Sequence, residues 1–147
     1  MKLKQLSLFL ENKPGALHRP IRVLADAKCN LLALSLAEAK QFGILRLIVR
    51  DWQRAQELLE KNGFVVKVTD VVAVEAPDRP GGLADVLDAL THAKINVEFM
   101  YAFTQTRLDR GVLVFCFNDP DKAIALLQKE RVNVVENVDW LAQSSGR

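Results

Sequence analysis

The sequence contains an internal repeat that covers most of its 147 residues. Residues 13–30 (KPGALHRPIRVLADAKCN) align with residues 79–96 (RPGGLADVLDALTHAKIN) at an offset of 80 − 14 = 66. Seven of the 18 aligned positions are identical, where chance gives about one. The identical pairs are Pro14/Pro80, Gly15/Gly81, Leu17/Leu83, Leu24/Leu90, Ala27/Ala93, Lys28/Lys94 and Asn30/Asn96. Because this period exceeds the roughly 20–50 residues of stacked repeats, each copy is predicted to be a small domain.

After a slip of two residues in one loop, the repeat continues at an offset of 68. The identical pairs there are Gly43/Gly111, Leu45/Leu113, Asp51/Asp119, Ala55/Ala123, Leu58/Leu126, Leu59/Leu127, Lys61/Lys129 and Val66/Val134. We therefore expect residues 1–69 to form one domain and residues 70–147 a second. Thr69 and Asp70 leave almost no linker between them, so independent tumbling is not expected.

Both copies show the same order of local patterns. In the first, the alternation of Leu6, Leu8 and Leu10 predicts a strand with one face in a core. The patterns that follow predict a turn at residues 12–15, a helix from about 17 to 28, and strands at 31–39 and 44–49. After these we expect a second helix, which Asp51 caps and Gly63 ends, and a last strand at 64–68. The second copy repeats this order over residues 71–138, with helices near 82–94 and 121–129. The order is βαββαβ, which predicts two α+β sandwiches of ferredoxin-like fold.

The predicted third strands, ILRLIV at residues 44–49 and VLVFCF at 112–117, are apolar at almost every position. This pattern is typical of strands buried on both faces. The predicted edge strands are also apolar, through Leu32, Leu34 and Leu36 in one copy and Phe99, Tyr101 and Phe103 in the other. We therefore expect the sheets to be joined edge to edge into eight strands, either within the chain or in a homodimer.

Composition excludes several classes of protein. The hydrophobic content of 50% and charged content of 26% are typical of a soluble globular protein. A net charge of +2 opposes nucleic-acid binding and polybasic membrane binding. The apolar run at residues 6–10 is too short for a signal peptide or a membrane span. Cys29 and Cys116 form no CxxC motif, so we expect no metal site or disulfide, and a cytoplasmic location.

ENKPGAL at residues 11–17 and PDRPGGL at 77–83, each followed by a helix ending in AKCN or AKIN, resemble the signature of ACT domains. The resemblance extends over about residues 6–138 and is similar to stand-alone tandem ACT proteins, which carry no catalytic domain. It implies two ACT-like domains, residues 1–69 and 70–147, of ferredoxin-like fold. It also implies an allosteric regulatory protein that binds an amino acid and acts on an enzyme partner on a separate chain.

The repeated Pro-Gly turn can be interpreted physically. Gly15 and Gly81 allow a backbone conformation that a side chain would block, and a helix N-terminus presents N–H groups to a carboxylate. Asn or Asp side chains beside the turn can accept hydrogen bonds from an ammonium group. In serine-sensing members of the family, the residues equivalent to Asn12 and Asn30 contact the effector. The candidate ligand-binding residues are Asn12, Pro14, Gly15, Ala16, Leu17 and Asn30 in the first copy, and Asp78, Gly81, Gly82, Leu83 and Asn96 in the second.

Departures from the family pattern and simpler roles remain open. Leu10 and Ala76 stand where serine-sensing members have a histidine, which argues against serine, and Pro20 falls within the first predicted helix. The Pro-Gly pairs could serve only as tight turns. Asn12 and Asp78 could cap the following helices. Asn30 and Asn96, which occupy the same place in the two copies, could adopt left-handed backbone conformations.

We expect no catalytic dyad, phosphate loop, metal site or cofactor, and hence a protein that is not an enzyme. The leading hypothesis is a regulatory protein that binds an amino acid at an interface between domains or subunits. The alternative is an ACT-type assembly module that binds a protein partner and no small ligand. An RNA-binding sheet is disfavoured because the strands lack exposed aromatics among basic residues.

Overall fold

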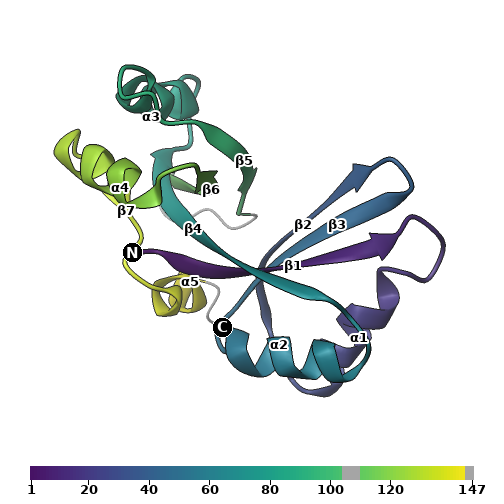
Figure 1. Cartoon of the computed structure of the whole chain (residues 1–147). Coiled ribbons are helices and arrows are strands. Elements are labelled where there is room, and N and C mark those ends of the chain that lie inside the picture. The colour runs from purple at the N-terminus through teal and green to yellow at the C-terminus, as the bar shows by residue number, and fades with distance from the viewer. Residues whose placement is uncertain (104–109, 145–147) are drawn as a thin grey trace. The chain divides into compact units, whose positions relative to one another are not determined.

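The predicted order of strands and helices is present in the computed structural model, which describes residues 1–103 and 110–144 (Figure 1). The chain divides into a first unit, Lys4–Thr69, and a second unit, which comprises Asp70–Arg147 and Met1–Leu3. The first unit contains β1 (Leu3–Glu11), α1 (His18–Asp26), β2 (Leu31–Ala39), β3 (Phe42–Val49), α2 (Trp52–Lys61) and the start of β4 (Val66–Pro77). The second contains the rest of β4, α3 (Gly82–Thr91), β5 (Val97–Ala102), β6 (Arg110–Phe117), α4 (Pro120–Lys129), β7 (Asn133–Val134) and α5 (Val138–Ser144).

Antiparallel sheets with two helices packed on one face confirm the ferredoxin-like α+β fold. In the first unit β3 pairs with both β2 and β1, and in the second β6 pairs with both β5 and β4. As the lack of a linker at Thr69 and Asp70 indicated, the last strand of the first copy and the first strand of the second are one continuous strand, β4. The end of the second copy differs from the sequence prediction. The last strand of the second copy, β7, has two residues, and a helix that was not predicted, α5, follows it.

The edge strands were expected to join the two copies. Among the described strands, β2 pairs with β3 in the first unit and β5 pairs with β6 in the second. The two copies together contain seven strands rather than eight, because β4 is both the last strand of the first copy and the first strand of the second. Among the described strands of its own unit, each of β2 and β5 has one neighbour and one free edge.

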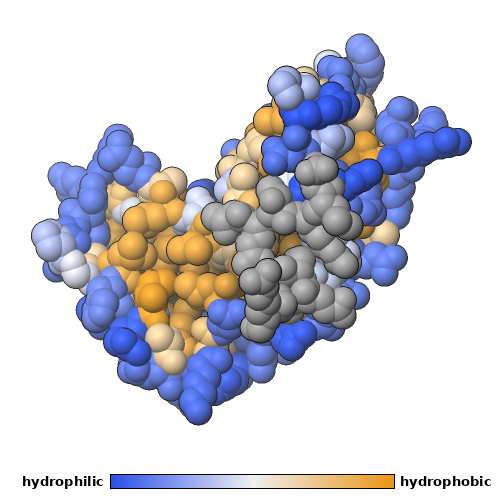
Figure 2. All heavy atoms as spheres, turned by 180° about the vertical axis from the view of Figure 1, so that it is seen from behind, coloured by the Kyte–Doolittle hydropathy of each residue, from blue (hydrophilic) through white to orange (hydrophobic). Residues whose placement is uncertain are grey.

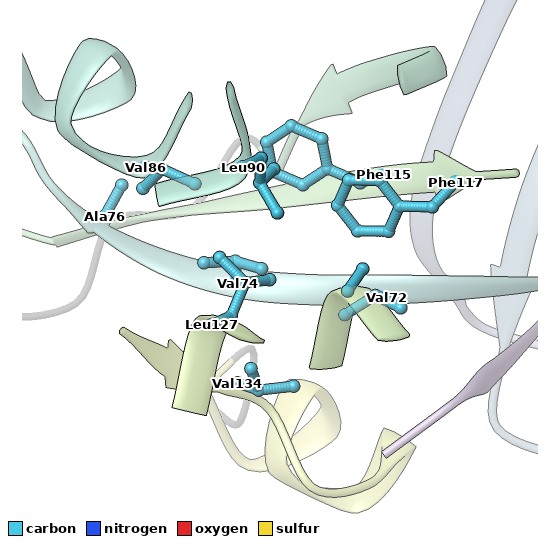
Figure 3. Close-up of a cluster of buried hydrophobic side chains, with 10 residues drawn as sticks. Val72, Val74, Ala76, Val86, Leu90, Phe115, Phe117, Leu127 and Val134 are labelled. Atoms are coloured by element: carbon cyan, nitrogen blue, oxygen red, sulfur yellow. The ribbon is translucent and has the colours of Figure 1, made fainter. Parts of the chain in front are cut away.

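Each unit has its own core on the helix-facing side of its sheet. In the first, Leu6, Leu8 and Leu10 are buried, as their alternation predicted, together with Leu24 of α1 and Leu59 of α2. The corresponding core of the second unit contains a stacked pair of aromatic rings with centroids 5.2 Å apart, Phe115 and Phe117 (Figure 3). The predicted burial on both strand faces is confirmed in the second half of β3 and β6, where consecutive residues are buried.

Turn chemistry also repeats between the units. Asp51 and Asp119 cap α2 and α4, because each carboxylate accepts a hydrogen bond from the backbone N–H three residues later. Gly63 follows α2 with a φ of +87°, and Arg131 occupies the matching place after α4 with a φ of +61°. No helix in the described ranges is long and apolar enough to cross a membrane.

Candidate functional site

The two Pro-Gly turns have nearly the same backbone. Gly15 and Gly81 have φ values of +85° and +87°, in the left-handed region that disfavours residues with a side chain. The backbone N–H of Lys13 donates to Glu11, and that of Arg79 donates to Pro77, both at 3.0 Å. The conformational need for glycine predicted from the repeat is therefore confirmed at both turns.

The helices after these turns start without help from Asn12 or Asp78. Leu17 is the N-cap of α1 and Gly81 is the N-cap of α3, and neither cap has a side-chain hydrogen bond. The interpretation of the two residues as helix caps is therefore wrong, and both side chains are exposed. Pro20 is the third residue of α1, where its missing N–H removes no intrahelical hydrogen bond.

Besides the N–H of Lys13 or Arg79, each turn uses a second backbone amide in an internal hydrogen bond. The N–H of Ala16 donates to Lys13 at 3.3 Å, and the N–H of Gly82 donates to Arg79 at 3.0 Å. A ligand carboxylate would therefore have to bind the other N–H groups of the turn and the first helical turn.

A hollow of about 260 Å³ lies beside the first turn, between the turn and β2. It is lined by Leu10, Glu11, Asn12, Lys13, Ala16, Leu17, Leu36, Ala37, Glu38 and Gly43. Three candidate residues, Asn12, Ala16 and Leu17, are among them, whereas Pro14 and Gly15 shape the turn without lining the hollow. Glu11 and Lys13 form an ion pair at 2.7 Å. The hydrogen bond from Lys13, and then its charge, lower the pKa of Glu11.

Asn30 lies at the opposite end of the first unit from Asn12. It lines a different hollow of about 460 Å³, with residues of α1 and the start of β2. Along β3, Phe42 pairs with Glu11 and Val49 pairs with Leu31. Seven residues of β-strand span about 23 Å. The structure therefore does not bring Asn12 and Asn30 together within one unit.

The backbone of Asn96 makes two hydrogen bonds with Asn118. Its N–H donates to the side-chain oxygen of Asn118 at 2.9 Å, and its carbonyl accepts from the backbone N–H of Asn118 at 3.2 Å. Its own side chain is exposed. The interpretation of Asn30 and Asn96 as left-handed turn residues is wrong, because Lys28 and Lys94 hold those conformations with φ of 58° and 56°.

Around the second turn, Gly81, Leu83 and Asp78 are exposed and Gly82 is buried. A Cβ at Gly82 would overlap the carbonyl oxygen of Pro77, so this turn is tighter than the first, which has Ala16 at the same place. Sequence reasoning missed Arg79, whose guanidinium binds Asp85 at 2.7 Å and the carbonyl of Pro80 at 3.1 Å. The sequence signal for this ion pair was a basic residue before the Pro-Gly turn, Arg79, and an acidic residue after it, Asp85.

A groove of about 740 Å³ in the second unit was also missed. It lies between α3, the segment after α4 and the end of β4, and its polar lining includes Glu75, Asp85, Arg110 and Arg131. No group of three metal-ligating side chains occurs in the described part of the chain. The cysteines in that part, Cys29 and Cys116, are both free thiols.

Comparison with known proteins identifies the family and the fold. A family model described as an ACT domain pair matches residues 1–143. Protein BT0572 from Bacteroides thetaiotaomicron is 41% identical, with a TM-score of 0.86 over 92% of each chain. The regulatory subunit of aspartate kinase from Thermus thermophilus, in its ligand-free form, is 17% identical, with a TM-score of 0.64 over 85% of this chain and 88% of that one. No curated protein sequence matches the chain.

Proposed function

Because the chain belongs to the ACT domain pair family, we propose that it is a non-catalytic regulatory protein that binds an amino acid between ACT domains. The hollow beside Asn12 supplies the observation that carries this proposal. It combines a turn at a helix start, an exposed amide side chain and apolar side chains of β2. These groups suit the carboxylate, ammonium and side chain of an amino acid.

The separation of Asn12 from Asn30 supports a site shared by two copies of the chain. β2 has a free edge with Leu34 and Leu36 about half exposed, at 49% and 51%. If two β2 strands pair antiparallel about Ser35, residue 38 of one copy lies opposite residue 32 of the other. The hollow beside Asn12 then lies next to the start of β2 in the partner, where Asn30 is. One ligand could contact both asparagines in such a homodimer.

Binding at a shared site would favour one arrangement of the subunits over others. The size of the response is limited by the ligand's differential affinity for the two arrangements. In Thermus thermophilus a chain of this fold is the regulatory subunit of aspartate kinase. We accordingly expect this chain to act on an enzyme that is a separate chain, in the cytoplasm.

A thermal-shift screen of the twenty amino acids at millimolar concentration tests the proposal. A ligand present at 100 times its Kd adds about 2.7 kcal/mol to the free energy of unfolding, which is a readily measured rise in Tm. We expect Asn12→Ala and Asn30→Ala each to weaken binding at least tenfold without lowering the Tm of the free protein. Stabilisation by none of the twenty would contradict the proposal.

The alternative of a protein assembly module has one observation in its favour. In the first unit Phe9, Phe42 and Val65 are 61%, 51% and 82% exposed, and Figure 2 shows apolar side chains gathered on one face of this unit. Exposed apolar patches usually mark interfaces. A negative amino-acid screen, together with self-association that Phe9→Lys abolishes, would favour this alternative.

A further inference from the structure

The groove of the second unit is distinct from the Pro-Gly site. It shares Pro77 and Gly82 with the turn, but Asp78, Gly81, Leu83 and Asn96 are not part of its lining. The groove faces the other side of α3, toward the segment that follows α4. Its lining residues are Glu75, Pro77, Gly82, Asp85, Val86, Asp88, Ala89, His92, Ala93, Arg110, Leu126, Glu130, Arg131, Val132 and Asn133.

The internal repeat shows which side chains open this groove. In the first unit, Arg19 of α1 lies over the ring of Phe64, 5.1 Å from its centroid. By the offsets of the repeat, Asp85 replaces Arg19 and Val132 replaces Phe64 in the second unit. The loss of a ring and of the stem of an arginine leaves a space that the smaller pair does not fill.

Several charged groups of the groove are already paired. Glu75 accepts a hydrogen bond from the side chain of Asn133 at 2.6 Å and lies 4.0 Å from the guanidinium of Arg110. Asp85 pairs with Arg79 at 2.7 Å. These contacts fix the polar groups at the two ends of the groove and satisfy their charges.

Three charged side chains of the lining remain unmatched. Within residues 1–103 and 110–144, the structure records no ion pair or side-chain hydrogen bond for Asp88, Glu130 or Arg131. One guanidinium and two carboxylates are thus available in a space lined by Val86, Ala89 and Val132. A ligand with the complementary charges carries one carboxylate and two cationic groups.

The backbone of Arg131 resembles that of its counterpart in the first unit. It has a φ of +61°, whereas the equivalent residue of the first unit is Gly63, with a φ of +87°. A side chain in the left-handed region costs about 1 kcal/mol relative to glycine. Lys28 and Lys94 hold the same conformation after α1 and α3, so it marks the end of a helix.

We propose that this groove is a second ligand site, which binds a small molecule with one carboxylate and two cationic groups. A free basic amino acid has this charge pattern, and so does a dipeptide that contains one. Arg131 holds the carboxylate through paired N–H donors, and Asp88 and Glu130 hold the cationic groups. The apolar lining contacts the methylene groups between them. From Asp85 to His92 the helix wall is about 10 Å long, which suits either molecule.

Isothermal titration with lysine, arginine and a lysine-glycine dipeptide tests the proposal and distinguishes the two sources of this chemistry. Norleucine, which lacks the second cationic group, and glutamate serve as controls. We expect saturable binding of the basic ligands and at least tenfold weaker binding of both controls. Absence of binding by all three basic ligands at millimolar concentration overturns the proposal.

Three variants locate the binding. Val132→Phe introduces the residue that stands at this position in the first unit, and we expect it to abolish binding. Arg131→Gly should weaken binding at least tenfold and also raise the Tm, because it relieves the left-handed conformation. Lys40→Gly is the matched control: it relieves the same conformation, with a φ of 61°, in the turn between β2 and β3, so it should raise the Tm and leave affinity unchanged.

Asn12→Ala separates this site from the Pro-Gly site. The proposal requires that Asn12→Ala leave the affinity for basic ligands unchanged while Arg131→Gly lowers it. Loss of binding in Asn12→Ala with none in Arg131→Gly would assign the ligand to the Pro-Gly site and overturn the proposal. Equal affinity of the wild type, Val132→Phe and Arg131→Gly proteins would overturn it as well.

Discussion

The guanidinium of Arg54 donates a hydrogen bond to the carbonyl oxygen of Ala27, with an Nη2–O distance of 2.9 Å. Ala27 is the C-cap of α1, and Arg54 lies in the first turn of α2. In the second unit the ammonium group of Lys122 binds the carbonyl of Ala93 at 3.0 Å. A cation that binds the unpaired carbonyls at a helix end is favourable. In both units, a cationic side chain at the start of the second helix therefore binds a carbonyl at the end of the first helix.

This relationship predicts that Arg54 can be replaced by lysine but not by alanine. We expect Arg54→Ala to lower the free energy of unfolding by about 1 kcal/mol, because a carbonyl at the helix end loses its partner. Arg54→Lys should retain most of that stability, since Lys122 makes the same bond in the other unit. Urea denaturation followed by circular dichroism measures both, and equal losses in the two variants would contradict the expectation.

The caps of α2 and α4 give a second, paired prediction. Asp51 accepts from the N–H of Arg54 at 3.3 Å, and Asp119 accepts from the N–H of Lys122 at 3.1 Å. Replacement of either aspartate by alanine should cost about 1 kcal/mol of unfolding free energy, and replacement by serine should cost less. The same urea experiments measure the losses, and serine variants as unstable as the alanine variants would rule out capping as the cause.

These contacts follow the internal repeat, which is why the sequence alone could predict the fold. Apolar periodicity and turn residues are local signals, and both copies carry them in the same order. The shortness of β7 and the helix α5 escaped prediction because neither is encoded in a periodic pattern. The groove escaped for a related reason: substitution of Phe64 by Val132 preserves the apolar pattern and changes the volume that is filled.

The site was predictable to the extent that backbone conformation determines it. The glycines of both turns could be predicted, because a positive φ favours glycine regardless of the surroundings. The separation of Asn12 from Asn30 could not be predicted, because it depends on the length of α1 and the register of β3. The sequence also left open whether Asn12 and Asp78 cap α1 and α3, because asparagine and aspartate suit several roles beside a turn.

Gly82 provides a test of the tight second turn. A Cβ at this position would overlap the carbonyl of Pro77, so Gly82→Ala must move backbone atoms. We expect a loss of about 1–3 kcal/mol, as for other overpacked sites. Gly111→Ala is the matched control, because no atom of the described residues lies within 4 Å of a Cβ there. Thermal unfolding compares the two, and a Gly82→Ala protein as stable as Gly111→Ala would show that the turn relaxes without cost.

The ion pair of Glu11 and Lys13 predicts a pH effect at the first turn. The hydrogen bond and charge of Lys13 lower the pKa of Glu11. A lowered carboxylate pKa stabilises the fold above the unfolded-state pKa, and that stabilisation is lost as the pH falls through the folded-state pKa. Lys13→Gln should raise the pKa of Glu11 toward its usual value, measured by NMR titration of its side-chain carboxyl carbon. An unchanged pKa would show that the ion pair does not persist in solution.

The free edge of β2 predicts how the chain self-associates. Leu36 is 51% exposed on this strand, and an added charge there opposes pairing of two edges. We expect the wild-type protein to sediment as a dimer and Leu36→Lys to sediment as a monomer with an unchanged circular dichroism spectrum. Val65→Lys is the control, because Val65 is 82% exposed and lies outside β2, so this variant should remain a dimer. Dissociation of Val65→Lys alongside a dimeric Leu36→Lys would shift the interface away from β2, and with it the proposed pairing of Asn12 with Asn30 of the partner subunit.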